Sequence, residues 1–370
     1  MVVRMARAVM VLSMLVCATV AEGQTLGSSV GPLRVDRVVA GLDTPWALGF
    51  LPDGGVLITE RDGRLLHVAQ GRAQPVAGVP TVAAVGQGGL LDVLVPRDFA
   101  RSREVYFSFA RPQAGGGAGT ALARGVLSSD GSRLADVQVI FEMAPGSRGG
   151  RHFGSRVVEG RDGMIYLTTG DRGDGPSAQD LSRHEGSVIR VHRDGSVPAD
   201  NPFVGRDGVQ PEIWSHGHRN PQGAALDADG RLWVVEHGAR GGDEVNRVEK
   251  GANYGWPVIS YGRHYSGARI GEGTAKDGLE QPAHYWDPSI APAGLMIYSG
   301  ALWPEWRGDL FTGSLKFGLI SRVDGDTLSE AERLEGPETG RVRDIREGPD
   351  GAIWFISENN GAVYRLTPGG

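Results

Sequence analysis

Four segments of this chain share one short pattern. Each begins with Asp-Gly and continues into apolar residues, and they span residues 53–58, 162–167, 229–234 and 350–355. Asp-Gly is a strong hairpin-turn signal, and the apolar run that follows is typical of a buried strand. The four aspartates are separated by 109, 67 and 121 residues. Two of these intervals are near twice a unit of about 55 to 60 residues, which is close to a β-propeller blade with its loops.

Other short apolar or alternating runs recur along the chain, each bounded by Gly, Pro, Asp or Asn. This arrangement favours strands over helices. We therefore predict an all-β fold, a six-bladed β-propeller of about four strands per blade, with the active site on its channel face. Residues 33–39 are expected to pair with a last strand near 363–366 and close the ring. A β-sandwich pair and a β-helix remain open as alternatives.

The first 23 residues have the pattern of a signal peptide. Arg4 and Arg7 precede an apolar stretch at 8–16, and small residues at 19–23 offer a cleavage site. The apolar stretch is too short to span a bilayer, so export is expected rather than membrane insertion. The prediction is a signal peptide at 1–23 and a single domain at 24–370, in a periplasmic or secreted protein.

Composition narrows the possible partners. Cys17 is the only cysteine and lies in the predicted signal peptide, so the exported protein has to be stabilised by its core, by ring closure or by bound metal. The formal net charge is −6, which gives no support to nucleic-acid binding. We expect a monomer or a homodimer.

Histidines cluster in the middle of the chain, since eight of nine lie between residues 152 and 284. His152 stands in a glycine-flanked loop just before a predicted strand, where its imidazole can act as a general base near neutral pH. Asp171 follows the next strand and is a candidate to orient a catalytic histidine. The ordinary alternative is that Asp171 only caps a turn.

The segment 216–223 is unusually rich in polar groups. Arg219 can stabilise a developing oxyanion, and Asn220 can donate to a cofactor oxygen. His216 and His218 share a face if the segment is a strand, which also allows a zinc site. A solvated polar loop explains the same residues equally well.

Two further segments carry charge patterns. The loop 237–244, followed by Asn246, Asn253 and Tyr254, offers the carboxylates and carbonyls that a hard cation such as calcium prefers, although a solvated loop is the alternative. Lys316 and the pair Arg341 and Arg343 stand out in an acidic protein. Residues two apart in a strand point the same way, so the two guanidiniums can meet one anionic ligand. Taken alone, they also fit an ordinary charged strand.

Several strings of residues together resemble the soluble quinoprotein sugar dehydrogenases. This is the glucose/sorbosone dehydrogenase family, and the similarity is greatest to its aldose sugar dehydrogenase branch. The resemblance runs from about residue 42 to residue 351, which is nearly the whole chain after the signal peptide. The most specific strings lie at residues 87–91, 178–181, 200–203, 219–223, 241–244 and 253–257.

The resemblance implies a six-bladed propeller that binds pyrroloquinoline quinone (PQQ) and calcium, and it implies a role for each matching residue. His152 matches the general base, Asp171 its partner and Arg219 the residue beside the reactive quinone carbonyl. The other matches concern cofactor and metal binding. The residues that match cofactor contacts are Gln87, Asn220, Lys316, Arg341 and Arg343. The backbone carbonyls that would hold the catalytic calcium are those of Gly238 and Ala239. Ligands of a second, structural calcium are implied at Glu244 and Tyr254.

The implied reaction is oxidation of an aldose at its anomeric carbon to a lactone, with electrons passing on to an acceptor that the sequence does not identify. Two departures from the family matter. Arg151 stands where the glucose-specific members carry Asp, so a preference for glucose does not follow. Ala293 stands where many relatives have a hydroxyl residue, which predicts the loss of one cofactor hydrogen bond, worth about 1 kcal/mol.

Two other functions fit the same architecture. A calcium-dependent lactonase would need metal-ligating carboxylates and Asn on the channel face, but not Lys316, Arg341 and Arg343 together. A non-catalytic carbohydrate-binding propeller would tolerate the loss of His152 and Arg219.

Overall fold

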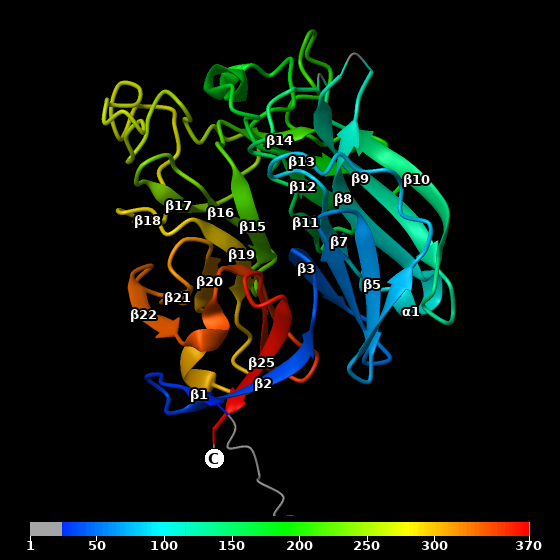
Figure 1. Ribbon diagram of the computed structural model, residues 1–370. Helices are drawn as coiled ribbons and strands as arrows, with labels where there is room; N and C mark the ends of the chain where they lie inside the picture. The colour runs from blue at the N-terminus through cyan, green and yellow to red at the C-terminus, as the bar shows by residue number, and fades with distance from the viewer. Residues whose placement is uncertain (1–23, 115, 145, 370) are drawn as a thin grey trace, which may run out of the picture.

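Six antiparallel sheets surround a central axis in the computed structural model, which describes residues 24–114, 116–144 and 146–369 (Figure 1). The predicted signal peptide at 1–23 lies outside the described residues. Each sheet is one propeller blade, and the innermost strands of neighbouring blades pack against one another around the axis. The predicted six-bladed β-propeller is therefore confirmed.

The first three blades follow one another along the chain, each from its inner to its outer strand. Blade 1 consists of β3 (Pro45–Phe50), β4 (Val56–Glu60), β5 (Arg64–Ala69) and β6 (Arg72–Val76). Blade 2 consists of β7 (Leu90–Leu94), β8 (Glu104–Pro112), β9 (Ala118–Leu127) and β10 (Leu134–Glu142). Blade 3 consists of β11 (Val157–Glu159), β12 (Ile165–Thr168), β13 (Ser187–Val191) and β14 (Ile213–His216).

The next two blades repeat this order, and the last blade joins the two ends of the described chain. Blade 4 consists of β15 (Pro221–Leu226), β16 (Leu232–Glu236), β17 (Asp243–Arg247) and β18 (His284–Trp286). Blade 5 consists of β19 (Pro292–Ile297), β20 (Leu310–Ser314), β21 (Leu319–Val323) and β22 (Glu330–Glu335). Blade 6 consists of β23 (Val342–Glu347), β24 (Ile353–Ser357), β25 (Ala362–Pro368), β2 (Leu33–Ala40) and β1 (Gln24–Leu26).

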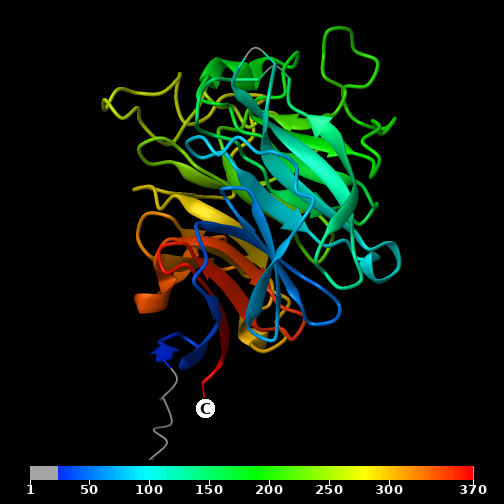
Figure 2. The ribbon, with the colours of Figure 1, turned by 45° about the vertical axis from the view of Figure 1, so that its right-hand side comes forward.

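Ring closure occurs where the sequence predicted it. Strand β2 pairs antiparallel with β25, with Leu33 opposite Pro368 and Ala40 opposite Ala362. Figures 1 and 2 show the blue and red strands side by side. Closure of this kind removes exposed sheet edges without a disulfide, which suits a chain whose single cysteine lies outside the described residues.

The Asp-Gly turns connect the first and second strands of blades 1, 3, 4 and 6. In each turn the glycine has a positive φ, for example 86° at Gly54, and its N–H donates to the carbonyl three residues earlier. The interval of 67 residues therefore spans one blade, whereas those of 109 and 121 span two. In blades 2 and 5 the same connection is longer and holds α1 (Phe99–Ser102) or the 3-10 helix η2 (Pro304–Trp306).

The hydrophobic core is divided among the interfaces between neighbouring blades. The buried apolar residues form six clusters within the described part of the chain, and each cluster joins two neighbouring blades. Burial of this kind is worth about 25 cal/mol per Å² of apolar surface. Each interface stabilises both of its blades, so the ring resists opening at any single point.

Antiparallel strands put alternate connections at opposite ends of the propeller. The Asp-Gly turns lie at one end, and the connections from each second strand to the third and from each blade to the next lie at the other. Nearly all of the predicted site residues belong to this second group, and the 3-10 helices η1 (Gly175–Gln179) and η3 (Pro337–Thr339) also lie there. No helix in the described ranges combines the length and the apolar character needed to cross a membrane.

Candidate active site

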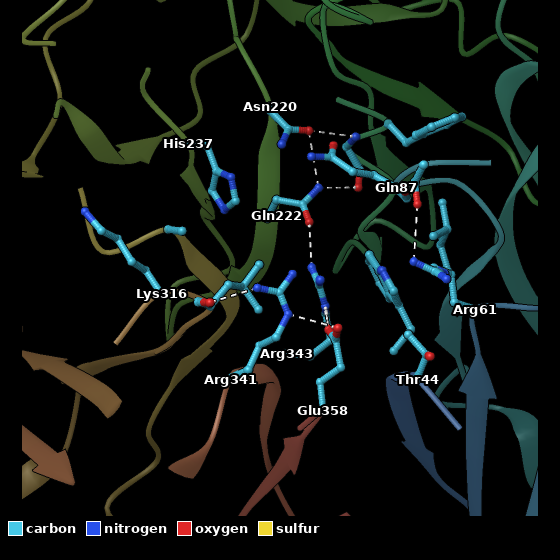
Figure 3. A pocket seen from close by; sticks show the side chains of 18 residues that line it. Thr44, Arg61, Gln87, Asn220, Gln222, His237, Lys316, Arg341, Arg343 and Glu358 are labelled. Carbon is cyan, nitrogen blue, oxygen red and sulfur yellow. Dashed lines mark hydrogen bonds and ion pairs between the residues drawn. The ribbon is translucent and has the colours of Figure 1, made fainter. Parts of the chain in front are cut away.

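A cavity of about 510 Å³ opens at this end of the channel, and its walls carry an excess of positive charge. Arg61, Lys316, Arg341 and Arg343 line it, whereas Glu358 is its one lining carboxylate (Figure 3). Gln87 and Asn220 also line it, and Figure 3 shows Arg61 on the same side as Gln87, whereas Lys316 and Arg341 lie across the cavity from them. The predicted cofactor contacts are thus gathered around one space.

Arg341 and Arg343 are held by one carboxylate. Their Nε atoms each donate to Glu358, at 2.9 Å to Oε1 and 2.9 Å to Oε2 respectively. Burial raises the pKa of Glu358, but the two guanidiniums outweigh it, so that pKa lies below its usual value. The sequence argument for this pair is wrong in one detail: Arg341 precedes β23 and has a positive φ of 50°, so the two residues are not alternate residues of a strand. They meet because both reach Glu358.

Lys316 is more loosely held. It follows β20, and its Nζ donates to the carbonyl of Ser289 at 3.2 Å. No carboxylate pairs with it among the described residues, so its charge remains available to a ligand in the cavity. A single –NH₃⁺ of this kind binds an anionic oxygen as a point charge.

A second cavity of about 430 Å³ adjoins the first. His152, Asp171, Arg219 and Ala239 line it, together with Trp256 and with His264 and Tyr265 from the long β17–β18 connection. Residues close together in the sequence line different cavities. His152 and Arg219 line the second cavity, whereas Gly154 and Asn220 line the first. The candidate base and arginine therefore stand at the boundary between a cationic pocket and an open one.

His152 and Asp171 form a buried pair, with 2.5 Å between Nδ1 and Oδ1. Asp171 also accepts hydrogen bonds from the backbone N–H of Gly173 at 2.7 Å and, through Oδ2, from Nε1 of Trp256 at 2.8 Å. Burial raises the pKa of this carboxyl, but the hydrogen bond from His152 and its positive charge outweigh that effect and lower it overall. An ionised Asp171 then accepts the Nδ1 proton, which leaves Nε2 of His152 as the basic atom.

Burial lowers the pKa of His152 below 6.5; the hydrogen bond to Asp171 opposes this shift, and the nearby charge of Arg219 adds to it. At neutral pH the imidazole is therefore neutral and able to take a proton. This is the state that a general base requires.

The backbone around the base is tightly defined. His152 has a positive φ of 54°, and its N–H donates to Oε1 of Gln87 at 2.7 Å. A Cβ on Gly170 would lie 2.2 Å from the carbonyl oxygen of His152, so only glycine fits there. Gln87, predicted at the active-site rim, therefore positions the loop of the base as well as lining the first cavity.

Arg219 and Asn220 lie between β14 and β15, where the chain enters the inner strand of blade 4. One guanidinium nitrogen of Arg219 donates to the carbonyl of His237 at 3.1 Å, while its buried Nε has no hydrogen-bond partner. Oδ1 of Asn220 accepts from the N–H of Gly154 at 3.1 Å. Because Arg219 lines the second cavity, its guanidinium can stabilise a developing negative charge there.

The predicted carbonyl donors Gly238 and Ala239 lie between β16 and β17. Buried Asp243 fixes this loop, because its Oδ1 accepts from the N–H of Gly238 at 2.8 Å and its Oδ2 from that of Ala291 at 2.7 Å. A Cβ on Gly238 would lie 2.2 Å from the carbonyl oxygen of Gly242. The structure brings Ala239 to the second cavity, whereas Gly238 lines neither of these two cavities.

Glu244 lies close to a second carboxylate, that of Glu236. Burial and the charge of Glu236 raise the pKa of Glu244 well above its usual range. Nδ2 of Asn246 donates to both glutamates, at 2.9 and 3.1 Å, while its Oδ1 is buried without a partner. This set of oxygens suits a hard cation, which would supply the missing positive charge. The hydroxyl of Tyr254 already donates to the carbonyl of Arg247 and accepts from the N–H of Glu249.

One expectation from the sequence receives no support. Within the described ranges no cluster of three or more His, Cys, Asp or Glu is placed to hold a metal, so His216 and His218 lack the extra ligands of a zinc site. Nδ1 of His218 instead contacts Glu236 at 2.8 Å.

Ala293 is fully buried in β19, and Ala291 lines the first cavity in its place. This side chain does not reach the cavity, and the predicted loss of a cofactor hydrogen bond at Ala293 stays a prediction.

The residues that line the two cavities and were missed by the sequence reasoning include Arg61, Trp256, Gln222, His237 and Glu358. Oε1 of Gln222 accepts from Arg343 at 3.2 Å, and burial lowers the pKa of His237 to about 3, so its ring is neutral. Trp256 and Gln222 stand within strings that carried the family resemblance, which was a usable signal. Glu358 follows a strand at the end of the chain and had none.

Comparisons with known proteins identify the family of this chain and agree with its fold. The family model described as Glucose / Sorbosone dehydrogenase matches residues 42–365. The aldose sugar dehydrogenase YliI of Escherichia coli is 41% identical over 352 residues, which cover 93% of this chain and 95% of that protein. The crystal structure of soluble aldose sugar dehydrogenase from Escherichia coli in the apo-form has a TM-score of 0.87 at 41% identity, covering 91% of this chain and all of that one. The PQQ-bound aldose sugar dehydrogenase from Streptomyces coelicolor has a TM-score of 0.76 at 27% identity, covering 90% and 98%.

Proposed function

The chain belongs to the glucose/sorbosone dehydrogenase family, a family of oxidoreductases, and from this premise we propose that it oxidises aldose sugars at the anomeric carbon to lactones, using PQQ and calcium. The observation that carries the proposal is the position of the His152–Asp171 pair. It lies between a cationic cavity suited to an anionic cofactor and an open cavity suited to a sugar.

The first cavity fits the chemistry of PQQ. This cofactor carries three carboxylates, and the lining offers Lys316, Arg341, Arg343 and Arg61. Asn220 and Gln87 add polar groups to the same lining. When bound there, PQQ would supply a two-electron acceptor for hydride, and calcium at the carbonyls of Gly238 and Ala239 would supply a Lewis acid.

In the proposed reaction, a side chain of the protein takes up the proton that the sugar releases. Nε2 of His152 takes the proton of the anomeric hydroxyl while the hydrogen on C1 leaves as hydride with the electron pair of its bond. The sugar thereby gives up two electrons and two hydrogens and becomes a lactone. Asp171 holds Nδ1–H and stabilises the imidazolium that forms. Trp256 fixes the second carboxylate oxygen of Asp171. The guanidinium of Arg219, which lines the second cavity, would stabilise developing negative charge.

The oxygens of Glu244, Glu236 and Asn246 would hold a second calcium with a structural role. Any contribution from Tyr254 would come through its backbone carbonyl, because its hydroxyl is engaged. The predicted signal peptide at 1–23 places the enzyme outside the cytoplasm, where sugars and an external electron acceptor are accessible.

The cationic cavity also separates this proposal from a lactonase or a non-catalytic carbohydrate-binding propeller, since neither needs Lys316, Arg341 and Arg343 around one space. The direct test is to titrate the metal-free apo-protein with PQQ in the presence of calcium and to desalt it. Quinone absorbance retained at one equivalent, with aldose oxidation, supports the proposal. Absence of retained quinone contradicts it.

A further inference from the structure

The second cavity is lined by two guanidiniums without a carboxylate partner. Arg151 and Arg219 both face it, and neither has a carboxylate oxygen within 4.0 Å among the described residues. The arginines of the first cavity differ, since Arg341 and Arg343 share Glu358. An uncompensated cationic lining is a binding surface for an anion.

The one carboxylate that lines this cavity is not available to the substrate. Oδ1 of Asp171 accepts hydrogen bonds from Nδ1 of His152 and from the N–H of Gly173, and Oδ2 accepts one from Nε1 of Trp256. The cavity therefore lacks a free carboxylate to accept hydrogen bonds from sugar hydroxyls. Its exposed side chains, Arg151, His264 and Tyr265, are donors or mixed donors and acceptors.

Arg151 combines a fixed backbone with a free side chain. Its carbonyl oxygen accepts from the buried guanidinium of Arg172, which lies 3.4 Å from the ring centroid of Phe153. Its side chain is exposed and extends over Gly173, where an added Cβ would lie 3.1 Å from Nε of Arg151. The guanidinium thus runs along the wall of the cavity beside the Asp171 loop, one residue from the base.

The β17–β18 connection adds two arginines near the cavity, Arg263 and Arg269, within the segment 256–271. Acidic residues also stand next to the lining: Glu272 follows Gly271, and Asp174, which lies 3.9 Å from Arg183, separates Gly173 from Gly175. Exposed charges of one sign raise the local concentration of an oppositely charged substrate, and salt screens the effect.

We propose that the second cavity selects aldoses that carry an anionic group away from the anomeric carbon, and that Arg151 is the specificity-determining residue. The inference rests on the proposed function and names its substrate class. The anion is a carboxylate, as in a hexuronic acid, or a phosphate, since both oxygen arrays match the arginine fork. Oxidation still occurs at C1, with loss of one hydride and one hydroxyl proton, and the anionic group stays unchanged.

The test compares the enzyme loaded with PQQ and calcium on glucose, glucuronate and glucose 6-phosphate. We expect a higher kcat/KM for at least one anionic sugar than for glucose, by about 10-fold or more. Arg151→Ala should lower the ratio of anionic to neutral kcat/KM by about 10- to 100-fold. Arg37→Ala is the matched control, because it removes the same charge from an exposed position on β2, and it should leave the ratio unchanged.

A second readout does not depend on turnover: calorimetric titration of the apo-protein with glucuronate or glucose 6-phosphate should give binding that weakens with salt and is lost in Arg151→Ala. The two anionic sugars decide between carboxylate and phosphate. A wild-type ratio near one, or equal losses on neutral and anionic sugars in Arg151→Ala, overturns the inference and leaves the proposed function standing. Failure to oxidise any of the three sugars overturns both.

Discussion

Nδ1 of His152 and Oδ1 of Asp171 are 2.5 Å apart, although the two residues enter the site from different connections of blade 3. Asp171 is also tied to Trp256 from blade 4, and the N–H of His152 to Gln87, which precedes blade 2. Three blades thus position one imidazole. This convergence is the physical basis for assigning the base.

Replacing the base should separate chemistry from cofactor binding. We expect His152→Ala to lower kcat by about 100-fold or more, because no other described group takes its place beside Asp171, and to change the Kd for PQQ little. Steady-state kinetics and a PQQ titration measure the two effects. His192→Ala is the control, since His192 lies in the β13–β14 connection at the other end of the propeller. Wild-type turnover in His152→Ala would remove this residue from the role.

The pH dependence follows from the lowered pKa of His152. Activity requires the neutral imidazole, so kcat/KM should fall on acidification with a midpoint below 6.5. Asp171 raises this pKa, so Asp171→Asn should shift the midpoint to lower pH and also lower kcat. Asp174→Asn, an exposed neighbour in the same loop, should leave the profile unchanged. An Asp171→Asn profile that superimposes on the wild type would contradict the pairing.

Lys316 offers the clearest test of the cofactor cavity, since within the described part of the chain its Nζ has one hydrogen bond, to the carbonyl of Ser289 at 3.2 Å. Lys316→Gln should weaken PQQ binding by about 10-fold, as expected for the loss of a charge-assisted hydrogen bond, with little change in thermal stability. Calorimetric titration measures the Kd. Lys250→Gln removes the same charge from an exposed position outside both cavities and serves as the control. Equal affinities in the wild type and in Lys316→Gln would rule out this contact.

Calcium should stabilise the fold through the glutamate pair. At a calcium concentration 100 times Kd, one site adds about 2.7 kcal/mol to the free energy of unfolding. We expect thermal melts of the chelator-treated protein to show a higher Tm on adding calcium, and Glu244→Gln to lose most of this increase. Glu249→Gln, at an exposed glutamate paired with Arg247, should retain it. An undiminished calcium response in Glu244→Gln would remove Glu244 as a ligand.

The sequence predicted the inner parts of the fold better than the outer ones. The turns after Asp53, Asp162, Asp229 and Asp350 were found because they precede fully or largely buried second strands, whose apolar runs are conspicuous. Outer strands such as β6 and β22 carry mostly exposed, polar residues and have no apolar run to detect. Their pairing is decided by the sheet, not by local composition.

The candidate site shows a similar division. His152, Asp171 and Arg219 were identifiable because they stand in glycine-rich or polar strings at strand ends. Glu358 was not, since its role depends on Arg341, which immediately precedes β23, and on Arg343, which lies in β23. The φ of Arg341 and the burial of Ala293 likewise depend on backbone details that residue spacing does not contain.

The most direct test of the central claim is dye-linked oxidation of aldoses by the purified apo-protein, with PQQ and calcium added separately and together. The account predicts activity only when both are present, with a lactone as the product and one PQQ bound per chain. Full activity without PQQ, or no activity across neutral and anionic aldoses with both added, would contradict it.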